Sequence, residues 1–429
     1  MDDKILNNIA VRYGTPVYVY EKEIVFSQFE KLKNCLPEEF QIFYSMKANP
    51  LIGLCQLFKK MGSGIEAASP GELHTALAAG FPPERIIFTS PGKTQEELEY
   101  AIETGIFSIT IESLEEARII NRIALQMSRK VDICIRINPN FDVSGSSLKM
   151  SGVPTQFGID QVQMEETFQL LNSLTGVNVI GVHIYTGTQV LNAHNIVLNM
   201  EQIILLALEL SERYSFELKF LDLGGGFGIP YFKGEEHLDL DTLRSELAVL
   251  WEKYKGRLAK TKVAVESGRF LMAEAGTYLI KVLYQKECKG RKYAVCDGGS
   301  NHHASSAFLG RYIRNNFPMH VVNKTDNEEE VNIVGPLCTP TDVIGQTVML
   351  PGIAPGDIIA VEKSGAYGMT QSPVLFLSHP LAAEVLYDTG RTTILRERGS
   401  KEDFLKGQIA ISNTDVTFLE SLNDMEKIV

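Results

Sequence analysis

The sequence predicts an α/β fold, in which a (β/α)8 barrel is joined to a mostly antiparallel β domain. Between residues 36 and 268, eight short apolar segments alternate with amphipathic helical segments, which matches such a barrel in count and length. Beyond residue 269 the long helical patterns stop, and short β segments alternate with Gly/Pro turns. A doubly wound open sheet is the alternative, because periodicity does not show that a sheet closes.

The elements follow in order along the chain. A short helix, a strand at 15–20 and a helix from Glu21 come first, and we assign residues 1–35 with residues 269–429 to the β domain. Barrel strands are predicted at 42–46, 64–68, 86–89, 108–111, 131–137, 179–184, 220–223 and 262–265. Intervening helices are predicted at 70–79, 95–104, 114–124, 164–174, 195–214 and 241–254. The β domain should hold strands at 278–287, 292–295, 331–334, 347–350, 358–361 and 383–387, and we expect the N-terminal strand to join them.

Composition excludes several classes of protein. The 429 residues exceed one ordinary core, and 41 basic against 53 acidic residues give a net charge of −12, which argues against nucleic-acid and anionic-membrane partners. No apolar run approaches the roughly eighteen residues of a membrane span, and the first residues lack a signal-peptide pattern. Six scattered cysteines without a C-x-x-C pair predict no metal site, no disulfide framework and a cytoplasmic location.

Chemically unusual residues fall at the carboxyl ends of successive predicted strands, where barrels gather functional groups. Lys47 follows the first strand, and an amine there is costly unless its charge is used, paired or removed. A lysine that merely reaches solvent is the bland alternative. The other residues of this kind are Glu66, Arg136, His183, Thr188, Gly224, Gly225, Gly226, Glu266, Gly268 and Arg269.

These residue types fit together as one site. The run Gly224–Gly226 lets successive backbone N–H groups face an anion, to which Arg269 and Thr188 can add donors. Lys47 supplies an amine for an imine. Glu266 is suited to keep a ring nitrogen protonated, and His183 can stack on a ring. An amine, a phosphate site and a carboxylate for a ring nitrogen describe a pyridoxal 5′-phosphate site.

The β half adds three features. Cys338 lies between two prolines, Tyr367 lies between glycines, and His302 and His303 form a polar pair. The bland alternatives are an inert buried thiol, a turn aromatic, and a solvated loop or pocket wall for the histidines.

Taken together, these motifs resemble the ornithine and diaminopimelate decarboxylase family of fold-type III pyridoxal-phosphate enzymes. The resemblance runs over nearly the whole chain. The motifs that carry it are Tyr44-x-x-Lys47-Ala48-Asn49, Glu66-Ala67-Ala68-Ser69-x-x-Glu72, Ser90-Pro91-Gly92-Lys93, Gly181-x-His183-x-x-x-Gly187-Thr188, Gly224–Gly228, Glu266-x-Gly268-Arg269, Gly335-Pro336-x-Cys338 and Gly365-Ala366-Tyr367.

The resemblance implies a role for each matching residue. Lys47 would bind the cofactor covalently, His183 would stack on its ring, and Glu266 would hold its ring nitrogen. Its phosphate would be bound by Gly226, Thr188, Arg269 and Tyr367, with Arg136 and Glu66 lining the site. Cys338 would reach the site of a partner subunit in a head-to-tail homodimer and assist protonation. A carboxylate at Glu266 favours decarboxylation over racemisation, since racemases of this fold are known for an arginine there.

Departures from the family pattern bear on the substrate. Where the ornithine and diaminopimelate enzymes have an acidic residue after the cysteine, this chain has Thr339, and the usual His-x-His is His183-x-Tyr185. The Cys-Thr-Pro-x-Asp version resembles a branch that includes the carrier-protein-bound glutamate decarboxylase of butirosin-type antibiotic assembly and siderophore decarboxylases. The candidate substrate residues are Thr339, Asp342, Arg311 and Tyr367.

We therefore expect a pyridoxal-phosphate decarboxylase of secondary metabolism, acting on a modified or acyl-carrier-protein-bound amino acid of the glutamyl type. Diaminopimelate decarboxylase of lysine synthesis and a non-catalytic, decarboxylase-like regulatory protein are the alternatives. Loss of site residues would favour the regulator, and Lys47, Glu266 and Cys338 are all present.

Overall fold

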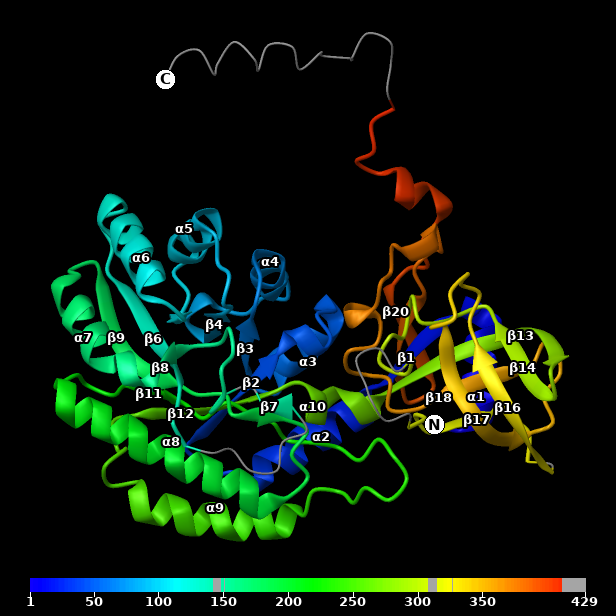
Figure 1. Ribbon diagram of the computed structural model, residues 1–429, viewed down its shortest axis with the longest axis horizontal. Helices are drawn as coiled ribbons and strands as arrows, with labels where there is room; N and C mark the ends of the chain where they lie inside the picture. The colour runs from blue at the N-terminus through cyan, green and yellow to red at the C-terminus, as the bar shows by residue number, and fades with distance from the viewer. Residues whose placement is uncertain (142–147, 150, 308–314, 326, 411–429) are drawn as a thin grey trace.

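The computed structural model describes residues 1–429 except 142–147, 150, 308–314, 326 and 411–429. An α/β barrel and a β domain lie side by side, with the N-terminus at the β domain (Figure 1). The candidate substrate residue Arg311 lies outside the described residues. Among the residues that are described, no helix has both the length and the apolar character needed to cross a membrane.

The barrel is closed by eight parallel strands. They pair in the order β5-β4-β3-β2-β12-β11-β9-β6, and β6 returns to β5, where Ile109 pairs with Ile133. The eight strands are β2 (Phe40–Ser45), β3 (Gly64–Ala67), β4 (Ile86–Thr89), β5 (Ser108–Ile111), β6 (Val131–Asn138), β9 (Val177–His183), β11 (Phe220–Asp222) and β12 (Lys262–Ser267). This closure confirms the predicted barrel and excludes the open sheet.

Helices surround the barrel strands (Figure 1). The helices of the chain are α1 (Asp3–Tyr13), α2 (Lys22–Cys35), α3 (Ile52–Lys60), α4 (Pro70–Ala78), α5 (Gln95–Thr104), α6 (Leu114–Gln126), α7 (Met164–Ser173), α8 (Ala193–Tyr214), α9 (Leu240–Tyr254) and α10 (Arg269–Met272). Local sequence explains their boundaries. Ser69, Thr94 and Ser113 accept backbone N–H groups as N-caps, and Gly105 ends α5 in the left-handed conformation.

The β domain contains one mixed, mostly antiparallel sheet. Its main order is β17-β16-β14-β13-β1-β19-β20, and β18 pairs with both β13 and β15. Its strands are β1 (Val17–Glu21), β13 (Gly276–Cys288), β14 (Arg291–Cys296), β15 (Met319–Val321), β16 (Glu328–Val334), β17 (Val343–Pro351), β18 (Ile358–Val361), β19 (Ala383–Asp388) and β20 (Arg391–Arg396). The N-terminal strand β1 lies between β13 and β19, as expected.

Several small elements were not anticipated from the sequence. Strands β15 and β20, and the short strands β7 (Leu148–Lys149), β8 (Ile159–Asp160) and β10 (Gly187–Thr188), have no counterpart in the predicted set. Helix α2 falls outside the proposed barrel boundary at residue 36, yet it packs against α9 of the barrel as well as against β19. The junction between the two domains is therefore continuous rather than a linker.

An apolar plug fills the interior of the barrel. Its residues come from six strands and form a cluster separate from the main core: Phe43, Ile87, Cys134, Ile180, Phe220 and Ala264. The ring of Phe220 packs edge-on against Phe43 at 6.0 Å and against Phe107 at 5.0 Å between centroids. Because inward-facing residues alternate along each strand, the next inward layer toward the carboxyl ends begins two residues later.

Candidate active site

A polar layer lies directly above the apolar plug. Two residues beyond the plug positions of β2, β6, β11 and β12 stand Ser45, Arg136, Asp222 and Glu266, each at most 7% exposed. Glu66 of β3 and His183 at the end of β9 complete the layer, 2% and 1% exposed. Six polar side chains withdrawn from water in one layer are costly unless they serve a site.

Lys47 projects from the turn after β2, within the short 3-10 segment Met46–Ala48. Its Nζ lies 3.2 Å from Oε1 of Glu66, and Ser45 Oγ donates to the other oxygen of the same carboxylate. Desolvation lowers the pKa of Lys47, but the carboxylates of Glu66 and Glu266 raise it, and the net direction is upward. The amine is therefore charged in the unliganded protein, and its charge is paired with Glu66 rather than removed.

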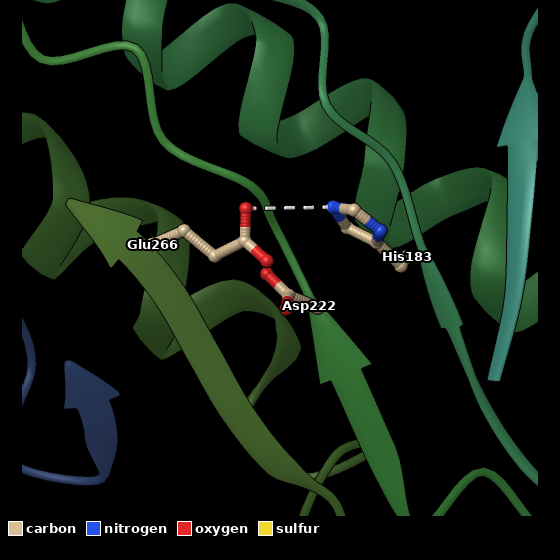
Figure 2. A group of neighbouring side chains, drawn as sticks. All are labelled: His183, Asp222 and Glu266. Atoms are coloured by element: carbon tan, nitrogen blue, oxygen red, sulfur yellow. Dashed lines mark ion pairs between the residues drawn. The ribbon is translucent and has the colours of Figure 1, made fainter. Parts of the chain in front are cut away.

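The side chains of Glu266, Asp222 and His183 lie beside one another (Figure 2). The carboxyl groups of Glu266 and Asp222 approach each other, and Nε2 of His183 lies 3.7 Å from Oε2 of Glu266. Burial raises the pKa of Glu266, and the neighbouring Asp222 and Glu66 raise it further. Burial also raises the pKa of Asp222, to about 7. The carboxyl pair therefore holds a proton near neutral pH.

Three buried polar atoms of this group have no hydrogen-bond partner: Oε1 of Glu266 and both ring nitrogens of His183. Desolvation lowers the pKa of His183, and Arg136 and Lys47 lower it further, so the imidazole is neutral. The ligand-type atoms of the three side chains lie within 4.8 Å of one another, the one such group found among the described residues. An unpartnered carboxyl oxygen that retains a proton suits a basic ring nitrogen.

The positive charge of Arg136 is paired with a carboxylate within the barrel wall. Its Nη1 lies 2.8 Å from Oε1 of Glu112, and the guanidinium stacks on Phe157 at 4.7 Å. The other oxygen of Glu112 accepts the backbone N–H of Gly158 at 2.9 Å. Arg136 thus orders the 156–158 segment while its charge lies beside the polar layer.

The glycine-rich loop and Arg269 form an anion cradle. A Cβ on Gly225 would collide with the carbonyl oxygen of Glu266, and one on Gly226 (φ +93°) with that of Gly187. Only glycine permits this close backbone path. Arg269 begins α10, donates to the Tyr231 hydroxyl at 3.2 Å, and has a buried Nε without a partner. The cavity here is lined by Ser45, Lys47, Tyr185, Thr188, Gly226, Phe227, Glu266, Ser267, Gly268, Arg269 and Tyr367.

The β domain contributes Tyr367 to this cavity. Its ring lies under the Arg269 guanidinium at 4.6 Å, and its backbone N–H donates to Ala48 at 2.9 Å. A non-glycine residue with φ +57° is strained, and such strain concentrates at functional sites. Asn49 adds a second tie to the β domain by donating to the Gly365 carbonyl at 3.2 Å.

Three further candidates, Cys338, Thr339 and Asp342, do not line this cavity. Cys338 is exposed, and Thr339 bonds to Thr341 at 3.0 Å between their hydroxyl oxygens. Asp342 is buried and accepts the backbone N–H groups of Ser300 and Leu337, at 2.6 and 2.7 Å.

The two histidines of the β domain differ from their expected placement. His302 and His303 were expected in a solvated loop or pocket wall, but they are 2% and 0% exposed. His303 hydrogen bonds to the Ser364 hydroxyl, and its ring stacks with Tyr18. That expectation is wrong because the histidines pack into the aromatic core between β1 and β13.

Sequence reasoning missed four residues of the site: Ser45, Glu112, Asp222 and Tyr185. Asp222 and Ser45 end barrel strands, so the strand-end argument that selected Glu66 and Glu266 applied to them as well. Glu112 follows β5 in the same way. Tyr185 lies in the loop after β9, and it stands where the family's second histidine was expected.

Comparison with known proteins identifies relatives whose cofactor fits the geometry of this cavity. Residues 22–273 match the family described as pyridoxal-dependent decarboxylase, pyridoxal binding domain. An L-glutamyl-(BtrI acyl-carrier protein) decarboxylase of Niallia circulans is 39% identical over 415 residues, covering 95% of this chain and 97% of that protein. The diaminopimelate decarboxylase of Aquifex aeolicus is 30% identical over 394 residues, covering 92% and 91%.

Solved structures of diaminopimelate decarboxylases superpose on both domains of this chain. Diaminopimelate decarboxylase of Methanocaldococcus jannaschii in complex with L-lysine superposes with a TM-score of 0.87 at 27% identity, covering 94% of each chain. Diaminopimelate decarboxylase of Helicobacter pylori with L-lysine gives 0.84 at 26%, covering 94% of this chain and 98% of that one.

Proposed function

This chain belongs to the pyridoxal-dependent decarboxylases, and from that premise we propose that it uses pyridoxal 5′-phosphate to decarboxylate a carrier-bound glutamyl group. The observation that carries the cofactor is the meeting of Lys47, Glu266 and Arg269 in one cavity. An amine, a buried carboxyl and an anion cradle match the carbonyl, the ring nitrogen and the phosphate of this cofactor.

The unsatisfied atoms of the cavity support this fit. Oε1 of Glu266 and Nε of Arg269 are buried without hydrogen-bond partners. The first suits a ring nitrogen and the second suits a phosphate, which are two separate groups of this cofactor. Gly225 and Gly226 leave room for backbone N–H groups to approach an anion, where side chains would collide with the chain itself. When bound, pyridoxal phosphate withdraws electrons from the substrate carbon that loses its carboxylate.

The residues of the polar layer manage the protons that this chemistry requires. The ammonium of Lys47 must lose a proton before it can bond covalently to a carbonyl carbon, and Glu66, 3.2 Å away, is the nearest base. Glu266 retains a proton because of burial and its neighbours. That proton can be held between Glu266 and a basic ring nitrogen, which keeps the nitrogen positively charged.

The substrate assignment depends on Thr339 and on the similarity to the Niallia circulans enzyme. An amino group at the far end of a free diamino acid calls for an acidic partner, and Thr339 carries no charge. We therefore propose a glutamyl thioester on an acyl carrier protein, with diaminopimelate as the second candidate. The similarity to the diaminopimelate decarboxylase of Aquifex aeolicus, at 30% identity, supports that second candidate.

We further propose a head-to-tail homodimer and a cytoplasmic location. Cys338 is exposed on the β domain and does not line the cavity of its own chain. A second copy would bring Cys338 to the cavity as a proton donor, as family resemblance implies. The non-catalytic alternative loses support because Lys47, Glu66, Glu266 and Arg269 occupy one cavity or its wall.

Two measurements test the proposed function. The purified protein should absorb visible light through a covalently held cofactor, and borohydride should fix that cofactor on Lys47; a colourless protein that binds no added pyridoxal phosphate would favour a regulator. Carbon dioxide release should then be compared for free glutamate, diaminopimelate, lysine, ornithine and a carrier-bound glutamyl thioester. We expect kcat/KM for the thioester to exceed that for each free amino acid by about a hundredfold or more. Efficient turnover of free diaminopimelate would contradict the substrate assignment alone.

A further inference from the structure

The hairpin that joins β13 to β14 is a basic, exposed surface on an acidic protein. Five of the twelve residues from 281 to 292 are basic and one is acidic, whereas the whole chain has a net charge of −12. Residues 283–292 are all exposed. Figure 1 shows β13 and β14 on the side of the β domain away from the barrel. An acidic molecule that approaches this chain is therefore repelled by its overall charge and attracted at this hairpin.

Three cations of the hairpin have no acidic partner of their own. Lys292 is paired with Glu329 on β16. In contrast, Lys286, Lys289 and Arg291 form no ion pair with any residue that the structure describes. Exposed cations that are not engaged within the fold can attract and orient an anionic partner.

A β-bulge turns an aromatic ring onto the outer face of this hairpin. Val282 of β13 pairs with Cys296 of β14. Two positions on, Tyr284 pairs with Val295, the neighbour of that cysteine, so Leu283 is an extra residue. Val282 is 1% exposed and faces the core, while Tyr284 is 68% exposed. Without the extra residue, Tyr284 would point to the same side as Val282, because side chains two positions apart share a face.

Two of the free cations lie on the same outer face as Tyr284. Lys286 pairs across the hairpin with Tyr293, and Arg291 pairs with Cys288. Positions 284, 286 and 288 share one face of β13, and their cross-strand partners share it with them. We call Tyr284, Lys286 and Arg291 the hairpin face. A tyrosine beside an arginine is typical of the anchor residues of protein interfaces.

The strand behind this face leads to the loop that carries Cys338. β14 ends at Cys296, and its six residues span about 20 Å at about 3.3 Å each. The backbone N–H groups of Ser300, just beyond β14, and Leu337 both donate to Asp342, at 2.6 and 2.7 Å. The hairpin face and the Cys338 loop therefore lie at opposite ends of one strand. A thioester is presented at the end of a long flexible arm, so a carrier can dock at a distance from the reacting group.

We propose that the hairpin face docks an acidic surface of the acyl carrier protein that delivers the substrate. This inference rests on the proposed decarboxylation of a carrier-bound glutamyl group. The arm of such a carrier is attached through a phosphodiester, which adds an anion beside the docking point. Two copies of the face would repel each other across a two-fold axis, since both are basic.

Steady-state kinetics with two substrates test the docking surface. One probe is glutamyl-loaded BtrI acyl-carrier protein, the carrier in the name of the 39% identical Niallia circulans relative. The other is the glutamyl thioester of free pantetheine, which lacks the carrier protein. We expect K286E/R291E to lower kcat/KM for the loaded carrier about tenfold, chiefly through KM, and to leave kcat/KM for the pantetheine thioester unchanged. Y284A should lower the value for the loaded carrier about fivefold.

A second charge reversal supplies the matched control. K130E/K260E reverses two exposed lysines just before β6 and β12, and it should change neither value. Added salt should lower kcat/KM for the loaded carrier more steeply in wild type than in K286E/R291E, because the variant lacks the attraction that salt screens.

The outcomes separate this inference from the proposed function. Equal kcat/KM for the loaded carrier in wild type, K286E/R291E and Y284A would overturn the docking surface alone, and so would a wild type that uses only the pantetheine thioester. A change in the oligomeric state of K286E/R291E, measured by light scattering, would assign the face to a second copy and also overturn it. If the wild type releases carbon dioxide from neither thioester, the proposed function and this inference fail together.

Discussion

At the scale of single residues, the carboxyl pair of Asp222 and Glu266 has the most strongly altered acid–base chemistry of the carboxyl groups in the site. Both groups are at most 2% exposed, and burial raises the pKa of each. The charge of Asp222 raises the pKa of Glu266 further. The backbone N–H of Gly224, 2.9 Å from Oδ1 of Asp222, lowers the pKa of Asp222 but does not offset burial. Asp222 thereby links the glycine loop to the carboxyl that would hold the ring nitrogen.

This link predicts a pH-dependent stability. An aspartate pKa raised from about 3.9 in the unfolded chain to about 7 in the fold contributes stability at low pH that is lost as the pH rises toward 7. Asparagine does not titrate. We therefore expect D222N to gain stability over wild type on going from pH 5 to pH 8, on the order of 2 kcal/mol after coupling to Glu266.

The measurement is thermal unfolding of cofactor-free protein at pH 5, 6, 7 and 8. D241N serves as a control, because the Asp241 side chain is 94% exposed. A difference between D222N and wild type that stays constant with pH would show that Asp222 does not carry this titration.

At the scale of elements, Lys93 ties together three parts of the barrel. Its side chain is fully buried, and Nζ donates to the carbonyl oxygens of Ser90, after β4, and Thr110, on β5, at 2.5 and 2.8 Å. It also lies 2.6 Å from Glu116 on α6. The Ser90–Lys93 motif, noted from the sequence as part of the family resemblance, thus has a structural role away from the cavity.

Removing this cation should be costly, because it leaves the buried Glu116 without its partner. We expect K93M to lower the free energy of unfolding by about 3 kcal/mol. The double variant K93M/E116Q should recover part of that loss, since it also removes the anion. Urea denaturation measures both, and K255M, which breaks an exposed pair with Glu252, should cost less than about 0.5 kcal/mol. Equal losses for K93M and K255M would contradict the tie.

At the scale of the whole molecule, the cavity lies where the two domains meet. Lys47 and Glu266 come from the barrel, and Arg269 begins α10 directly after the last barrel strand. Tyr367 comes from the β domain, and its backbone N–H donates to the Ala48 carbonyl in the Lys47 turn. Cys338 faces outward from the same β domain. A dimer in which each β domain serves its partner's barrel would use both surfaces.

Mixing two inactive variants tests that arrangement. K47A and C338A should each lose most activity, and in a mixed dimer one of the two sites would regain both residues. Random exchange of equal amounts should therefore restore up to about a quarter of wild-type activity. Mixing K47A with E266A, both within one barrel, is the control and should restore nothing. Absence of recovery after proven subunit exchange would show that Cys338 does not act across subunits.

Much of the fold was predictable because local rules dominate it. The predicted strands 86–89, 108–111 and 358–361 and the predicted helix 95–104 match the structure to the residue, since caps and turns bound them in sequence. The strands β15 and β20 escaped prediction because their pairing partners, β18 and β19, rather than their own patterns, define them. Closure of the barrel depends on the pairing of β5 with β6 and β12 with β2, which periodicity does not contain.

The sequence by itself determined the order of strand, polar residue and helix, and therefore which groups stand at the carboxyl ends: Lys47, Glu66, Glu266 and Arg269. Tertiary structure decided how those groups face one another. The register of the closed barrel puts Asp222 beside Glu266. The path of the chain after β9 puts Tyr185 beside Lys47 and leaves His183 beside Glu266. Distances, burial and charge between residues far apart in sequence arise only when the barrel closes, and these decide protonation and contact.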